Sequence, residues 1–125
     1  MAADVVMYLH DQSIRAYGGY HGVRDAALLA SALNRPHDKL DYNCRADFPD
    51  LAAAYAFGIA KNHAFIDGNK RTAWAVCVLF LKLNGIEVSV PPDDVVETMV
   101  ALATSAISEA DFARWLSRGC QPVPT

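Results

Sequence analysis

Two apolar runs that flank a short, densely charged segment constrain the fold of this chain more than any other feature. The first run covers residues 51–60, and the second run covers residues 73–81. A helix that is apolar on every face is packed by neighbours on all sides. The sequence therefore predicts two consecutive buried helices, at about residues 50–62 and 69–84, which meet at the charged segment 63–72.

The rest of the chain shows further helical patterns separated by glycine, proline and capping signals. Gly18-Gly19 ends the first helix, because glycine takes the left-handed cap conformation without steric cost. Asp25 is a plausible N-cap of the second helix, and Pro36 is expected to end it. Residues 36–49 are then expected to form a long loop or short irregular helical turns. The remaining predicted helices are residues 4–17, 26–34, 93–104 and 108–118.

The C-terminal region carries weaker signals. Residues 86–90 alternate weakly and predict a short extended segment, as half of a small β-ribbon. Ser108 with Asp111 approximates a capping box for the last helix. Residues 120–125 are expected to be a frayed tail. We therefore expect one domain over residues 1–125, a mainly α bundle of about six helices with at most a minor β-ribbon.

Composition limits the classes of function. The chain has 125 residues, 53% of them hydrophobic and 20% charged, as in a compact globule. Its net charge of −3 provides no overall positive field for nucleic acid. The three cysteines lack zinc-ligand spacing, which favours a reducing compartment. No apolar run approaches the length of about 20 residues that crosses a bilayer. We expect a soluble, cytoplasmic protein with no membrane contact.

The charged segment His63-Ala-Phe-Ile-Asp-Gly-Asn-Lys-Arg-Thr72 has the groups that bind a phosphate. A helix that begins near Gly68 and Asn69 leaves its first N–H groups free to bind an anion. Gly68 allows close approach of the backbone, and the Asn69 amide can donate a hydrogen bond. Lys70 and Arg71 place two cations in the first turn, where the helix dipole disfavours them and a bound anion would compensate.

Two further side chains of the segment suit phosphoryl or nucleotidyl transfer. Asp67 can hold Mg²⁺, which is commonly bound by one or two carboxylates together with substrate phosphates. The imidazole of His63 is the type of group that can remove a proton from an attacking hydroxyl near neutral pH. Each residue alone has a simpler explanation, such as a helix cap for His63 or Asp67 and a solvated cation for Lys70 or Arg71. Their combination favours a site.

The segment resembles the signature of the Fic/Doc (Fido) superfamily, and specifically of its Doc (death-on-curing) branch. Similarity extends to Arg15-Ala-Tyr-Gly-Gly, to Gly22-Val-Arg-Asp25 and to the helix end Lys-Leu-Asn-Gly85. The resemblance implies a Fido-type helical fold and a transferase that uses ATP and Mg²⁺ to modify a protein hydroxyl. It makes His63 the general base, Asp67 the Mg²⁺ ligand, and Gly68 to Arg71 the phosphate-binding loop.

The resemblance also separates two reactions. In the adenylylating Fic branch, the position of Lys70 is usually glycine and that of Trp74 is usually arginine. In the Doc branch, lysine and a non-arginine residue accompany a reversed nucleotide, so that the terminal phosphate meets the base. This implies a kinase-type enzyme that phosphorylates a Ser or Thr hydroxyl, by resemblance on elongation factor Tu, and thereby arrests translation. Protein adenylylation is the alternative.

Doc proteins are toxins of type II toxin–antitoxin pairs, so the resemblance implies a Phd-like antitoxin as partner. Its C-terminal segment would fold into an apolar groove, which we expect between the first helices. A ribonuclease is a more remote alternative, since Arg15 and His21 have a spacing found in small helical nucleases. A binding module without catalysis is another. His10, His21 and His37 are each interpreted as surface or packing residues.

Overall fold

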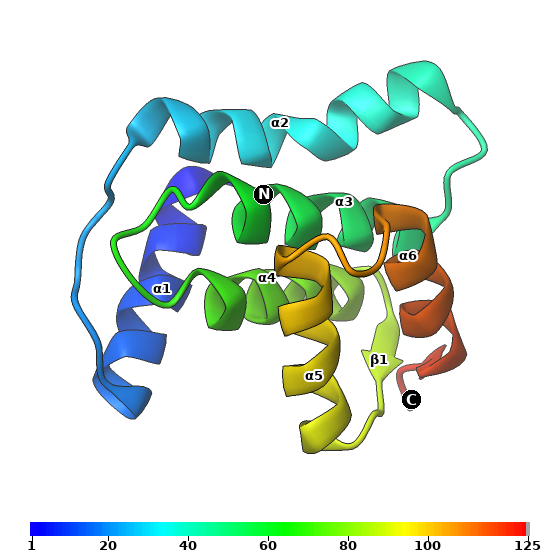
Figure 1. Ribbon diagram of the computed structural model, residues 1–125. Helices are drawn as coiled ribbons and strands as arrows, with labels where there is room; N and C mark the ends of the chain where they lie inside the picture. The colour runs from blue at the N-terminus through cyan, green and yellow to red at the C-terminus, as the bar shows by residue number, and fades with distance from the viewer. Residues whose placement is uncertain (125) are drawn as a thin grey trace.

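A computed structural model describes residues 1–124, which form a helical bundle around a central helix (Figure 1). This central helix, α3 (Phe48–Asn62), contacts α2 (Ala26–Tyr42), α4 (Asn69–Leu83) and α6 (Glu109–Arg118). Nine of its residues are buried, and they are spread around all of its faces. The predicted pair of buried helices at 50–62 and 69–84 is therefore confirmed.

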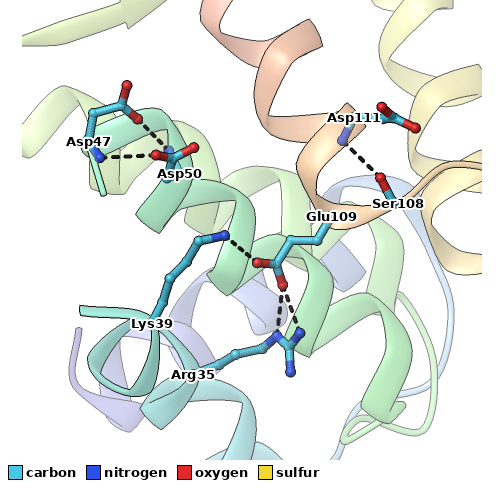
Figure 2. Close-up of polar contacts among 7 residues, drawn as sticks. All are labelled: Arg35, Lys39, Asp47, Asp50, Ser108, Glu109 and Asp111. Carbon is cyan, nitrogen blue, oxygen red and sulfur yellow. Dashed lines mark hydrogen bonds and ion pairs between the residues drawn. The ribbon is translucent and has the colours of Figure 1, made fainter. Parts of the chain in front are cut away.

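The start of α3 lies two residues before its predicted position. The Asp47 carboxylate accepts a hydrogen bond from the Asp50 N–H, and the Asp50 carboxylate accepts one from the Asp47 N–H (Figure 2). This reciprocal capping satisfies two N–H groups at the helix start. Pro49 is accommodated because it lies in the first turn, where its missing N–H has no intrahelical partner to lose.

Helix α1 (Ala3–Tyr17) packs against α4 and presents one apolar face to the bundle. Its buried residues Val6, His10 and Ile14 follow one another at four-residue spacing, which places them on the same side of a helix. The helix ends at Gly18, whose φ of +85° lies in the region that favours glycine. The predicted helix at 4–17 is confirmed.

Helix α2 corrects the prediction that Pro36 ends the second helix. The helix starts at the predicted cap, Asp25, but continues through a buried Pro36 to Tyr42, and so the expected loop at 36–49 shrinks to about residues 43–47. Tertiary contacts explain the difference. Arg35, directly before the proline, and Lys39, three residues after it, both bind the Glu109 carboxylate of α6 (Figure 2). These bonds hold the second half of α2 against the bundle despite the lost backbone hydrogen bond.

The C-terminal tail also differs from its prediction. Residues Cys120–Pro122 form strand β2, which pairs antiparallel with β1 (Ile86–Val88). The Val123 N–H continues the pairing by donating to the Gly85 carbonyl at 2.9 Å. The tail at 120–122 is therefore ordered by a ladder and is not frayed, whereas Thr125 lies outside the described residues. The expected half-ribbon at 86–90 is confirmed, and the tail is its partner.

The other predicted elements agree with the structure to within a residue. Helix α5 covers Pro92–Ala103 and α6 covers Glu109–Arg118, and the Ser108 hydroxyl accepts the predicted hydrogen bond from the Asp111 N–H (Figure 2). The described part of the chain thus contains six helices and one two-stranded ribbon, as expected for a mainly α Fido-type bundle. Across residues 1–124, none of the helices combines the length and the apolar character required to cross a membrane.

Candidate functional site

The charged segment forms a short loop between the two central helices. Helix α3 ends at Asn62 and is capped by His63, which takes the left-handed conformation with φ 51° and ψ 47°. Helix α4 begins after Gly68, which is also left-handed with φ 74°. The loop therefore turns sharply at both ends, and its middle residues Ala64 and Phe65 are buried in the core. We call residues 63–68 the site loop.

Asn69 gives the site loop its shape. Its buried carboxamide accepts a hydrogen bond from the Phe65 N–H and donates one to the Phe65 carbonyl, both at 3.0 Å. The amide was expected to donate to a phosphate, but in the structure both ends of it bond to the loop. Asn69 is thus a residue that positions the loop. Only its backbone N–H remains for the anion-binding role that was predicted for the start of α4.

A second segment, residues 18–25, pairs with the site loop along its edge. The Gly22 carbonyl accepts from the Ile66 N–H at 3.1 Å, and the Arg24 N–H donates to the Ala64 carbonyl at 2.7 Å. These bonds form an isolated antiparallel bridge between Val23 and Phe65. The site loop is therefore bonded to the segment that follows α1 as well as to α4.

Asp67 is fixed through both its side chain and its main chain. Its Oδ1 accepts a hydrogen bond from the Gly68 N–H at 2.8 Å, and its Oδ2 accepts a longer one from the Tyr20 N–H at 3.3 Å. The Asp67 carbonyl oxygen lies 2.6 Å from Nε2 of the buried His10. The carboxylate therefore has a defined direction before any ligand binds.

The two cations predicted for the phosphate site differ in their surroundings. Arg71 is half-buried, donates from Nη2 to the Gly18 carbonyl at 2.9 Å, and lies over the ring of Tyr17. A Cβ added at Gly68 would lie 3.3 Å from Arg71 Nη2, so the guanidinium reaches the start of α4. Lys70 is exposed in the same helical turn. Asp67, Gly68 and Arg71 are thus brought together, with Lys70 beside them.

His63 lies at the other end of the site loop, and its side chain is exposed. Its carbonyl oxygen accepts a hydrogen bond from Arg24 Nε at 2.8 Å, and Arg24 Nη2 also donates to the Asn62 carbonyl. Arg24 therefore binds the carbonyl groups at the end of α3. The sequence had suggested His63 as the cap of this helix end. Within residues 1–124 the imidazole makes no hydrogen bond, so it is available to a ligand.

The fit of a metal ion to this site depends on one carboxylate. No group of three or more His, Cys, Asp or Glu side chains in the described residues could hold an ion by itself. Mg²⁺ does not require such a group, because it keeps several waters and is often bound by one or two carboxylates and substrate phosphates. The Asp67 carboxylate suits this arrangement, since its longer bond to the Tyr20 N–H leaves Oδ2 weakly held.

Lys70 and Arg71, in the first turn of α4, are among the residues that line a large apolar groove between α1, α4, β1 and α5. The groove has a volume of about 1000 Å³. Trp74 and Val78 line it from α4, Leu9 lines it from α1, and Met99 and Val100 line it from α5. The prediction of a groove between the first helices is thus partly correct. Helix α1 lines the groove, but α4, α5 and β1 supply its other walls. Trp74, which replaces the arginine usual in the Fic branch, faces this groove.

Sequence reasoning missed three residues that hold the site loop: His10, Tyr20 and Arg24. His10 could have been noticed as part of the buried stripe of α1, whereas Tyr20 acts through its backbone and leaves no sequence signal. The pair proposed for a ribonuclease has another role. Arg15 and His21 both bind the Asp11 carboxylate, at 2.8 and 2.7 Å, and so tie the segment after α1 to its helix.

Fold and site together define a mainly helical protein whose two central helices are joined by a short loop that carries the predicted phosphate-site residues. Residues 1–81 match the model of the Fic/DOC family, and this chain belongs to that family, as its signature at 63–72 predicts. It is 32% identical over 118 residues to the "Protein kinase doc" of Escherichia phage P1, which covers 94% of this chain and 93% of that protein. It is 46% identical over 77 residues to the "Toxin Doc" of Mycolicibacterium smegmatis, covering 59% of this chain and 58% of the relative.

Proposed function

We propose that this chain is a Doc-type toxin that transfers the γ-phosphoryl group of ATP to a Ser or Thr hydroxyl of a protein, elongation factor Tu by family resemblance. One observation carries the proposal. The Asp67 carboxylate, the start of α4 and the Arg71 guanidinium gather at one place, and an unbonded His63 imidazole lies on the same loop. The similarity to a phage protein named a protein kinase supports the same reaction.

In this reaction His63 accepts the proton of the substrate hydroxyl. The hydroxyl oxygen then forms a bond to the γ-phosphorus, the bond from that phosphorus to the β–γ bridging oxygen breaks, and ADP leaves with the electron pair. An exposed imidazole at the end of α3 can approach a hydroxyl carried by a protein as large as an elongation factor. The phosphorylated Ser or Thr and ADP are the products.

The start of α4 and its cations bind the phosphates. The free N–H groups of the first turn, together with Lys70 and Arg71, compensate the negative charge that transfer places on the phosphate oxygens. Mg²⁺, when bound by Asp67, would neutralise part of the same charge. The backbone N–H of Gly68 donates to Asp67 and holds the carboxylate beside this anion site.

Adenylylation is the competing reaction, and the identities of Lys70 and Trp74 favour the kinase. Lys70 extends an ammonium from the first turn of α4, in space that the usual glycine of the adenylylating branch leaves open. Trp74 replaces an arginine with an uncharged indole that lines the groove. The anion site therefore has the charge of one lysine and one arginine, arranged at the start of the helix.

Isotope transfer separates the two reactions. The purified chain is incubated with elongation factor Tu, Mg²⁺ and ATP labelled at the γ- or the α-phosphate. The kinase proposal predicts label transfer from γ-labelled ATP only, with loss of transfer in His63→Ala and in Asp67→Asn. His37→Ala is the matched control, because His37 is also an exposed histidine but lies on α2. Transfer of the α-label would replace the kinase with an adenylyltransferase, and RNA cleavage without either label would favour a nuclease.

A growth assay tests the toxin role separately. Expression of this chain alone is expected to slow bacterial growth, and expression of His63→Ala is not. Equal growth of the two strains would contradict the proposal.

We further propose that a Phd-like antitoxin restrains the toxin by placing an amphipathic helix in the apolar groove. The groove walls expose Tyr17, Val96 and Val100, and the exposed Lys70 of the same lining would pair with an acidic residue of that helix.

A further inference from the structure

His10 is the one buried histidine among the four in the chain, with 3% of its surface exposed. Its ring lies parallel to the ring of Phe65, with centroids 4.0 Å apart and an interplanar angle of 8°. Its Nε2 is 2.6 Å from the Asp67 carbonyl oxygen, and a Cβ added at Gly68 would lie 3.7 Å from the same nitrogen. His10 therefore contacts Phe65 and Asp67 of the site loop from α1, and its ring lies near Gly68.

The partner of Nε2 determines the direction of this hydrogen bond. A carbonyl oxygen only accepts, so Nε2 carries the hydrogen and donates it to Asp67. A phenylalanine at this position could stack on Phe65 equally well, but it could not donate. The hydrogen bond is thus the part of the contact that requires a histidine and that packing alone does not explain.

The Asp67 carbonyl, which His10 binds, and the Gly68 N–H, which binds the Asp67 carboxylate, are the two ends of one peptide unit. The carbonyl of Asp67 and the N–H of Gly68 belong to the same planar, trans peptide and point in opposite directions. His10 binds the carbonyl side, and the N–H side donates to Asp67 Oδ1 at 2.8 Å. Rotation of this peptide would break both bonds. His10 therefore acts on the carboxylate through a rigid connection of two hydrogen bonds.

We propose that His10 is a positioning residue of the site: by fixing the Asp67–Gly68 peptide, it sets the direction of the Asp67 carboxylate for its ligand. The inference deepens the proposed function and rests on it, because Asp67 is there the residue that binds Mg²⁺. His10 does not touch the reacting atoms. It supplies a donor that keeps the site loop in one arrangement before substrate and ATP arrive.

Two variants separate the hydrogen bond from the stacking. His10→Phe keeps a ring against Phe65 and removes the donor, whereas His10→Gln keeps an amide N–H in place of the Nε2–H and removes the ring. Val6→Ala, in the same buried stripe of α1, serves as a control for lost packing. The measurements are the hydrogen exchange of the Gly68 amide, followed by NMR, and the Mg²⁺ concentration that gives a half-maximal rate of γ-label transfer.

We expect His10→Phe to exchange the Gly68 amide about tenfold faster than wild type and to need about tenfold more Mg²⁺, a loss typical of one hydrogen bond. His10→Gln is expected to stay within about threefold of wild type in both measurements, and Val6→Ala to lower only stability. If His10→Phe leaves either measurement unchanged, the inference is wrong and His10 is a packing residue. If wild type transfers no label, the proposed function fails, while the exchange rate still shows whether His10 fixes the peptide.

Discussion

The main chain of Gly19 lies directly against the carboxylate of Asp67, so that a Cβ atom added at Gly19 would be 2.6 Å from Asp67 Oδ2. Gly19 also has a φ of +117°, a backbone conformation that residues with a side chain rarely adopt. The neighbouring Gly18 has a similar φ of +85°, but open space surrounds its Cβ position. The two glycines thus differ mainly in their contact with the candidate metal ligand.

This difference gives a prediction with a matched control. Gly18→Ala should lower the free energy of unfolding by about 1–3 kcal/mol, the cost of a side chain in a backbone region that is populated almost only by glycine. Gly19→Ala should cost about 1–3 kcal/mol more, because its methyl group must displace Asp67 or the segment after α1. Urea unfolding of both variants measures the difference. Equal losses of stability would show that the close approach to Asp67 has no energetic consequence.

Asn69 offers a second prediction about the site loop. Asn69→Ala leaves the buried N–H and carbonyl of Phe65 without partners, at a cost of about 1–3 kcal/mol for each group. We expect a loss of about 2–4 kcal/mol in urea unfolding, together with a fall in γ-label transfer. Asn84→Ala is the control, because Asn84 donates to the carbonyl of Phe80 four residues before it but is exposed. A similar small loss in both variants would contradict the role of Asn69.

The parts of the fold that depend on local sequence were predictable, and those that depend on distant contacts were not. Helices α3 and α4 follow from their apolar character, and the site loop lies at the polar interruption between them. Helix α2 passes Pro36 because Arg35 and Lys39 bind Glu109, which is about 70 residues away. Strand β2 likewise depends on pairing with a distant β1.

The same distinction holds within the site. His63, Asp67, Lys70 and Arg71 were recognisable as candidates because they are adjacent in sequence and chemically distinctive. The sequence could not show that the Asn69 amide bonds to Phe65 instead of pointing to a ligand. Nor could it show that His10 contacts Asp67 across 57 residues of sequence. The contact between His10 and Asp67 depends on the packing of α1 on α4, which the sequence does not show.

Close packing of α3 on α2 gives a third prediction. A Cβ added at Gly58 would lie 3.0 Å from the Ala32 Cα, a backbone atom that cannot move alone. Gly58→Ala gains about 1 kcal/mol of helix propensity, but overpacking costs about 1–3 kcal/mol. We expect a net loss of stability and a lower melting temperature by calorimetry. A more stable Gly58→Ala protein would show that the two helices separate easily.

The buried thiol of Cys77 predicts a loss of stability at alkaline pH. Burial raises the pKa of Cys77 far above its ordinary value, with a smaller effect from Cys120. Above about pH 8.5 the unfolded chain ionises this thiol and the folded chain does not, so the unfolded state binds fewer protons. The free energy of unfolding should therefore fall as pH rises, by up to about 1.4 kcal/mol per pH unit.

Urea titrations between pH 7.5 and 10 check this dependence. Cys77→Ala should flatten the decline, even though it also lowers stability at neutral pH through lost packing. Cys44→Ala is the matched control, because it removes an exposed thiol, and it should not change the slope. A slope that is the same in Cys77→Ala as in wild type would assign the alkaline instability to other groups.

Binding of a Phd-like antitoxin in the groove predicts that a charge on its wall will weaken the complex. Val100 lies on α5, is 44% exposed and lines the groove, so Val100→Glu should not disturb the core but would place a carboxylate against an apolar helix face. Leu83→Glu is the matched control, because Leu83 is 70% exposed on α4 and does not line the groove. Titration calorimetry with the antitoxin should show at least about tenfold weaker binding for Val100→Glu, corresponding to about 1.4 kcal/mol, and no change for Leu83→Glu. Because the two substitutions introduce the same charge at exposed apolar positions, equal affinities would mean that the antitoxin binds a different face of the bundle.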